Sequence, residues 1–185
     1  MTTDINIPWH KYALIADLAK RMEEYPHQFG KTALQKLIFL LQELYEVKCG
    51  YEFRLYNYGP FSSQLLQDLD LVDVIEGVNV HSVSWGMGGY MITKGSKNDA
   101  VISMATDFIE SNRDSIKALT ENFGNFTAKE LELRSTIVYT SRYYSKLENE
   151  LDKSELIEMV NSIKPNFSED VVRSAVIELE SNGYI

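Results

Sequence analysis

Cysteine is nearly absent from this chain of 185 residues, which contains one, Cys49. A single cysteine excludes an internal disulfide framework. Long apolar runs are also missing, since the longest, around "LIFLL" at 37–41, is far shorter than the ~20 residues that cross a membrane. The first residues, "MTTDINIPWHKY", contain neither the basic nor the apolar stretch of a secretory signal. These absences predict a cytoplasmic protein with no membrane partner.

Positive charge is scarce: 18 Lys and Arg face 27 Asp and Glu, which gives a net charge of −9. Proteins that bind nucleic acid usually concentrate cations, because released counterions supply much of the affinity. The composition therefore disfavours nucleic acid as a partner, although one small basic face stays compatible with it. An acidic surface suits a basic protein partner equally well.

Patterns typical of metal and catalytic sites are missing too. No histidine has a metal-ligating neighbour at i+3 or i+4, so the three are interpreted as structural or surface residues: His10, His27 and His81. Cys49 has no identifiable activating base. The stretch "FGKTAL" at 29–34 resembles the tail of a phosphate-binding loop, but Tyr25 stands where that loop needs a glycine. The sequence predicts no metal, no cofactor and no enzymatic activity.

Acidic residues gather in "QDLDLVDVIEG", but they lack the ligand spacing of a calcium loop. A hydrated helix face is the favoured interpretation, and metal-dependent hydrolysis is a remote alternative. The residues concerned are Asp68, Asp70, Asp73 and Glu76.

Hydrophobic periodicity predicts a mainly helical α+β protein in a single domain, 1–185, with roughly seven helices. The widest apolar stripe, over 34–45, predicts a central buried helix with Thr32 as its cap. Thr127 and Glu130 have the spacing of a capping box before a later helix. The stretch from Asp99 to Phe123 is predicted to form one long helix or two shorter ones.

The segment "YEFRLYNYGPFSSQLLQDL" predicts a strand at 51–56, a corner at Gly59 and Pro60, and a helix capped by Ser62 or Ser63. A hairpin is predicted at 78–93, where glycines supply a tight turn. We expect this hairpin and the strand to form one antiparallel sheet. Residues 1–95 would then be a winged-helix-like half, and 96–185 an all-helical half packed on it.

Aromatic side chains cluster around this corner. Tyr51 and Phe53 are predicted to be core residues, because alternation along a strand turns some rings inward. The tentative partner-binding residues lie at the corner and at the tip of the 78–93 hairpin, because exposed aromatics are common interface anchors: Tyr56, Tyr58, Phe61, Trp85 and Met87.

"KTALQKLIFLLQ" followed by "YEFRLYNYGPFSSQLLQDLDLV" resembles the YwgA-like group of bacterial and archaeal proteins and, more distantly, the Panacea domain of SocA-like antitoxins. The resemblance covers about 31–76 and is weaker at "FTAKELELRSTIVY". It supplies motif positions and no catalysts, namely Gln35, Lys36, Tyr56, Tyr58, Gly59 and Pro60. It implies a non-enzymatic interaction module, antitoxin-, adaptor- or chaperone-like, whose partner is a toxin or a component of a phage-defence system.

The order helix, strand, helix and hairpin also suits a winged-helix DNA-binding regulator, which is the alternative function. Against it, "SSQLLQDLDLVDVIEG", the would-be recognition helix, contains carboxylates and no Lys or Arg. An enzyme acting on nucleic acid or nucleotides has only scattered carboxylates in its favour. Neither the identity of the partner nor the oligomeric state follows from the sequence.

Overall fold

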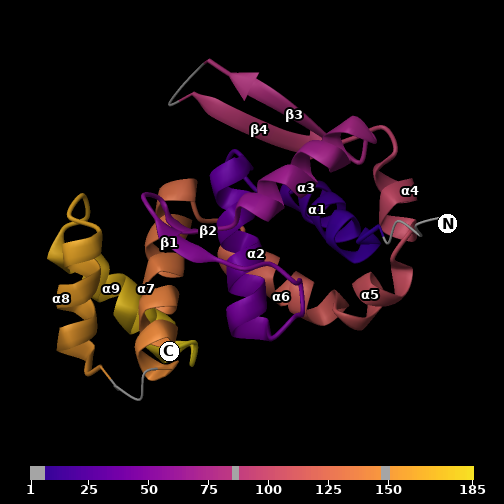
Figure 1. The fold of residues 1–185 in the computed structure, drawn as a ribbon. Coiled ribbons are helices and arrows are strands. Elements are labelled where there is room, and N and C mark those ends of the chain that lie inside the picture. The colour runs from indigo at the N-terminus through magenta and orange to yellow at the C-terminus, as the bar shows by residue number, and fades with distance from the viewer. Residues whose placement is uncertain (1–6, 85–87, 147–150) are drawn as a thin grey trace, which may run out of the picture.

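The computed structural model describes residues 7–84, 88–146 and 151–185, and it confirms a mainly helical α+β fold (Figure 1). The helices are α1 (Trp9–Met22), α2 (Lys31–Tyr45), α3 (Ser63–Val74), α4 (Asn98–Ser103), α5 (Thr106–Ser111), α6 (Arg113–Phe123), α7 (Ala128–Lys146), α8 (Lys153–Ile163) and α9 (Glu169–Ser181). The strands are β1 (Arg54–Tyr56), β2 (Gly59–Phe61), β3 (Val78–Val83) and β4 (Gly89–Lys94). Over the described ranges, no helix combines the length and the apolar character that crossing a membrane requires.

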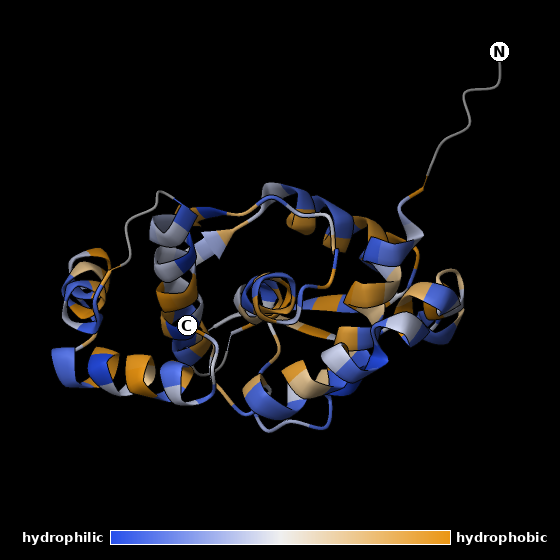
Figure 2. Ribbon diagram, turned by 90° about the horizontal axis from the view of Figure 1, so that it is seen from below, coloured by the Kyte–Doolittle hydropathy of each residue, from blue (hydrophilic) through white to orange (hydrophobic). Residues whose placement is uncertain are grey.

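Helix α2 lies at the centre of the molecule, as its wide apolar stripe predicts. Four of its leucines, Leu34, Leu37, Leu40 and Leu41, are fully buried, and it packs against α6, α7 and β2. Figure 2 looks nearly along this helix and shows the other elements arranged around it. A single core cluster contains residues from both 1–95 and 96–185, for example Leu37 and Ile137. The two parts of the chain therefore share one hydrophobic core.

Helices α8 and α9 pack against α7, on the side of α7 that faces away from α2 (Figure 1). Arg134 of α7 forms an ion pair with Glu178 of α9. The same guanidinium lies 3.6 Å from the ring centroid of Phe126, a cation–π contact. The ion pair fixes α9 against the outer face of α7, and the cation–π contact holds the Arg134 side chain in place.

The helix boundaries confirm the predicted capping box at Thr127 and correct the predicted cap at Thr32. Thr127 and Glu130 form the predicted capping box, with a 2.8 Å bond from the Thr127 N–H to the Glu130 carboxylate. The predicted Thr32 cap is wrong, because α2 begins at Lys31 and its N-cap is Gly30, two residues before Thr32. A side chain at Gly30 would clash with the carbonyl of Tyr90, 2.4 Å from a built Cβ.

The stretch from Asn98 to Phe123 forms three helices, so the prediction of one or two is wrong. Polar side chains bind backbone carbonyls where the helices end: Thr106 donates to Ser103 at 3.1 Å, and Asn112 donates to Phe108 at 2.7 Å. Such local bonds compete with the helical pattern and allow the chain to bend between α4, α5 and α6.

The predicted pairing of the strands is also wrong. Strand β1 pairs with β2, from Arg54↔Phe61 to Tyr56↔Gly59, around a two-residue turn. Strand β3 pairs with β4, and the two hairpins form separate sheets. Gly59 has φ +85°, which allows the chain to reverse directly before Pro60. The corner therefore turns a strand into a second strand before α3 begins.

Gly59 is the position at which a substitution tests this geometry. A Cβ there would lie 2.9 Å from Thr136 Oγ1, and the positive φ strains any β-branched residue. Gly59→Val is expected to lower the free energy of unfolding by about 2 kcal/mol or more, measured by urea denaturation. Gly183→Val is the matched control, since Gly183 also has a positive φ but nothing within 4 Å. Equal losses from both substitutions would show that the close approach to Thr136 is unimportant.

Candidate functional site

The β1–β2 hairpin is fixed from inside by two neighbouring side chains of α2. Gln35 donates to the carbonyl of Ser62 and accepts from its N–H, both at 2.8 Å. Lys36 donates to the carbonyl of Pro60 at 2.7 Å. Both side chains are buried, Gln35 at 2% and Lys36 at 1% exposure. Ser62 is the N-cap of α3, as predicted, but its hydroxyl makes no capping bond.

A third anchor, Lys164, comes from the residue that follows α8, and the sequence analysis missed it. Its Nζ donates to the carbonyl of Asn57 at 2.5 Å and forms an ion pair with Glu132 of α7 at 2.6 Å. Asn57 and Lys164 are 107 residues apart, so no local pattern signals this contact. The turn of the hairpin is thereby tied to α7 and α8.

The electrostatics of these anchors are unusual, because two buried lysines lie near one carboxylate. The pKa of Lys36 is lowered to about 8, mainly by burial; Glu132 opposes this shift and Lys164 adds to it. The ammonium group is held in place by the carbonyl of Pro60. The hairpin therefore depends on a buried amine that titrates within the range of an ordinary buffer.

Two tyrosines of the hairpin face solvent. Tyr56 is 66% and Tyr58 is 68% exposed. Phe61 of β2 is half-buried, and its ring packs against Tyr56 with centroids 5.8 Å apart. The structure thus brings together three of the predicted contact residues. The other two, Trp85 and Met87, lie outside the described residues.

Tyr51 is buried, as predicted, and its hydroxyl donates to Asp68 at 2.9 Å. Lys11 lies over the Tyr51 ring, 4.4 Å from its centroid. Burial raises the pKa of the Tyr51 hydroxyl, so this proton is retained at neutral pH. The interpretation of Asp68 as part of a hydrated face is wrong, because this carboxylate is buried as the acceptor for Tyr51.

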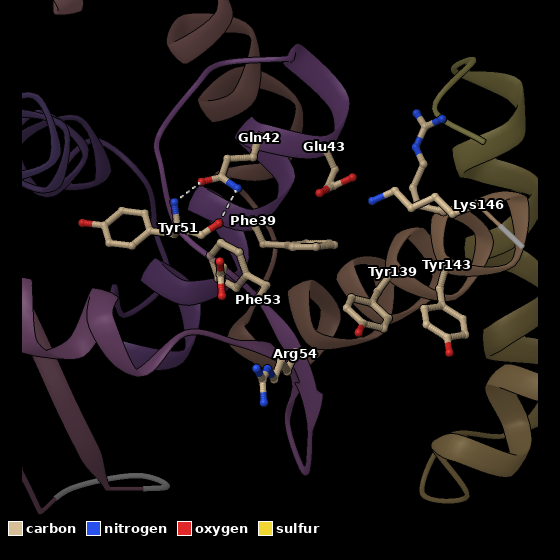
Figure 3. A pocket seen from close by; sticks show the side chains of 11 residues that line it. Phe39, Gln42, Glu43, Tyr51, Phe53, Arg54, Tyr139, Tyr143 and Lys146 are labelled. Atoms are coloured by element: carbon tan, nitrogen blue, oxygen red, sulfur yellow. Dashed lines mark hydrogen bonds between the residues drawn. The ribbon is translucent and has the colours of Figure 1, made fainter.

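An open groove lies between the segment 51–54, α2 and α7 (Figure 3). Its volume is about 310 Å³. Aromatic rings form its floor: Phe39 lies 5.3 Å from Phe53 and 6.1 Å from Tyr139, between centroids. Tyr143 continues the series, parallel to Tyr139 at 6.3 Å. The sequence analysis did not single out this groove, although the i, i+4 spacing of Tyr139 and Tyr143 on one helix is the signal that could have found it.

Figure 3 also shows charged side chains around these rings. Glu43 of α2 and Lys146 of α7 point towards one another across the groove, and Arg54 lies at its lower edge. Gln42 holds the backbone of Tyr51 with two bonds of 3.0 Å, and this fixes the wall opposite α7. The groove therefore combines an apolar floor with a polar rim.

Two residues that the sequence analysis considered as reactive groups, Cys49 and His10, take part in packing. Burial raises the pKa of the Cys49 thiol to about 12, which leaves very little thiolate at neutral pH. His10 packs edge-on against Phe108, at 5.5 Å between centroids. Over the described ranges, no group of three or more His, Cys, Asp or Glu side chains is placed to hold a metal ion.

No family model matches the chain, and the curated proteins include no significant match to it. The resemblance to YwgA-like proteins therefore stays a prediction from the residues quoted above. Gln35, Lys36, Gly59 and Pro60, which carry that resemblance, lie together in one hydrogen-bonded unit around the hairpin.

Lys36 gives the stability of the protein a specific pH dependence. The unfolded chain keeps this proton up to the ordinary pKa of 10.5, whereas the folded chain releases it near pH 8. The unfolded state binds more protons between these values, so the Lys36 contribution to stability rises with pH there, by up to about 3 kcal/mol. This contribution is fully present above pH 10.5 and is lost as the pH falls through about 8.

The measurement compares wild type with Lys36→Met by chemical denaturation at pH 7, 8, 9 and 10. The free energy of unfolding of wild type, relative to that of the variant, is expected to increase along this series. Lys97→Met, at an exposed lysine, is the control and should show no such increase. A constant difference between wild type and Lys36→Met would contradict the prediction.

Proposed function

We propose that the chain is a non-catalytic protein-interaction module, antitoxin-, adaptor- or chaperone-like, that contacts its partner through the β1–β2 hairpin. The observation that supports this best is the exposure of Tyr56 and Tyr58 on a hairpin whose backbone is anchored from inside. Tyrosine supplies a large amphipathic contact area with only two side-chain torsions to order, and it is enriched in binding hot spots. A toxin or another defence-system component as partner is an expectation from the family resemblance.

Anchoring of the hairpin favours binding energetically. An isolated hairpin of two three-residue strands is marginal in water, and ordering it on binding would reduce the affinity. Here the carbonyls of Asn57, Pro60 and Ser62 are already bound by buried side chains. The hairpin is thus ordered before the partner arrives, so the contact energy of its tyrosines is available for affinity.

The exposed face of α3 also favours protein over DNA. Leu71 and Val74 are exposed apolar residues on this helix, and its sequence contains no Lys or Arg. In a winged-helix protein this helix would enter the major groove, where cations normally contact the phosphates on either side. Apolar side chains and a carboxylate at Asp70 suit a protein surface better.

Replacement of both Tyr56 and Tyr58 by alanine is expected to weaken partner binding by about tenfold or more, because each ring is a candidate hot spot. The partner is first identified by purifying the tagged chain from the organism that encodes it, with mass spectrometry of stoichiometric proteins. Its affinity for wild type and the double variant is then measured by isothermal titration calorimetry.

Tyr90→Ala is the matched control, because Tyr90 is an exposed tyrosine on the other hairpin. The double variant should keep the wild-type stability, since both rings are mostly solvent-exposed. The proposal fails if no stoichiometric protein co-purifies, or if the partner binds the double variant as tightly as wild type.

A further inference from the structure

Strand β1 has an open edge. Pro60 has no N–H, so the pair Leu55↔Pro60 cannot exchange two backbone hydrogen bonds. The bonded pairs of the hairpin are therefore those on either side, and the N–H and C=O of Leu55 point away from β2. Among the described residues, no hydrogen bond outside the hairpin reaches either group. This edge can accept an added strand.

Two hollows that share lining residues adjoin this strand. The hollow of Figure 3 shares Arg54, Tyr139 and Tyr143 with a second one of about 490 Å³, which Leu55 and residues of α8 also line. We call the combined surface the β1 groove. Its apolar floor consists of Phe39, Phe53, Leu55, Tyr139, Tyr143 and Met159. Tyr143 is 50% exposed, so part of this aromatic surface is accessible from solvent.

The rim of the β1 groove is richer in cations than the chain as a whole. Arg54, Arg142 and Lys146 line it, against the two carboxylates Glu43 and Glu52. The chain as a whole has a net charge of −9. Among the described residues, neither Arg54 nor Arg142 forms an ion pair, whereas Arg21, Arg113, Arg134 and Arg173 do. The Arg54 guanidinium is therefore available to an anionic ligand group. Arg142 donates from one nitrogen to the carbonyl of Tyr184 at 3.3 Å and keeps its other N–H donors for such a group.

We propose that the β1 groove binds an extended, acidic peptide segment, which adds to β1 as a further strand. This inference rests on the proposed function and specifies the chemistry of the partner. Side chains two residues apart lie on the same face of a strand. The groove thus takes an apolar or aromatic side chain over Phe39 and Tyr139, and an acidic side chain two positions away, against Arg142 or Lys146.

A single strand of nucleic acid is the competing ligand, because it too stacks on aromatic rings between cations. Two observations favour the peptide. Glu43 and Glu52 line the same groove and would repel a continuous row of phosphates. The open edge of β1 presents an N–H and a C=O side by side, a pattern that a peptide backbone complements along its whole length.

The probe is a random twelve-residue peptide library displayed on phage and selected against the full chain. The enriched peptides are expected to share an acidic and an apolar residue two positions apart. The most enriched one is synthesised with a fluorescein label, and its binding is followed by fluorescence anisotropy. Arg142→Glu and Tyr143→Ala are each expected to weaken this binding by about tenfold, since one reverses the charge and the other removes an exposed ring.

Arg173→Glu on α9 is the matched control, because it reverses the charge of an exposed arginine outside the groove and should leave the affinity unchanged. In an added strand, every second backbone N–H of the peptide bonds to β1. Methylation of these nitrogens, one at a time, should abolish binding, whereas methylation of the nitrogens between them should not. Enriched peptides without the acidic–apolar pattern, or an affinity that Arg142→Glu leaves unchanged, would overturn the inference. Tighter binding of labelled oligothymidine, lost in Arg142→Glu, would overturn it in favour of nucleic acid.

Failure of this inference can be told apart from failure of the proposed function. One outcome is a natural partner that requires Tyr56 and Tyr58 yet binds the Arg142→Glu variant as tightly as wild type. That result would refute peptide binding at the β1 groove and leave the proposed interaction module intact. Selected peptides that bind the groove, with no stoichiometric partner in the native host, would refute the hairpin proposal alone.

Discussion

The arrangement of the candidate site depends on one interaction above the others, the hydrogen bond from the buried Lys36 ammonium to the carbonyl of Pro60. Strands β1 and β2 have three residues each, too few to form a stable hairpin without other support. Lys36, its neighbour Gln35 and the distant Lys164 bind the carbonyls that the short ladder leaves unpaired. Without these bonds the buried carbonyls of Pro60 and Ser62 would lack partners, at a cost of about 1–3 kcal/mol each.

The burial of two lysines near one carboxylate lowers stability, because the free energy of removing a charge from water exceeds what most ion pairs and hydrogen bonds regain. Methionines at these two positions would satisfy packing equally well, but they could not fix the direction of the Pro60 and Asn57 carbonyls. We infer that the lysines are used here for conformational specificity: they select one geometry for the hairpin. The lowered pKa of Lys36 reflects the free-energy cost of burying its charged form in the folded state.

The sequence was sufficient to predict the parts of the fold that depend on local pattern. The apolar stripe of α2 and the capping box of Thr127 follow from spacing within one element. Tyr51 is buried as predicted, although it precedes β1 and belongs to no strand. The pairing of β1 did not follow from spacing, because three-residue strands are too short for alternation to indicate a partner. Lys164 could not be predicted either, since its contact with Asn57 joins segments 107 residues apart. The β1 groove depends on how α2 and α7 pack side by side, which no periodicity encodes.

The two candidate contact surfaces belong to the same hairpin and are coupled by its geometry. Successive side chains of a strand point to opposite faces, so Tyr56 and Leu55 present different surfaces to a partner. The ion pair between Lys164 and Glu132 ties the hairpin turn to α7, and α7 carries the tyrosines of the groove. A partner that adds a strand to β1 therefore meets a floor and an edge whose relative position is already fixed. Affinity at either surface then depends on the buried anchors as well as on the residues that touch the partner.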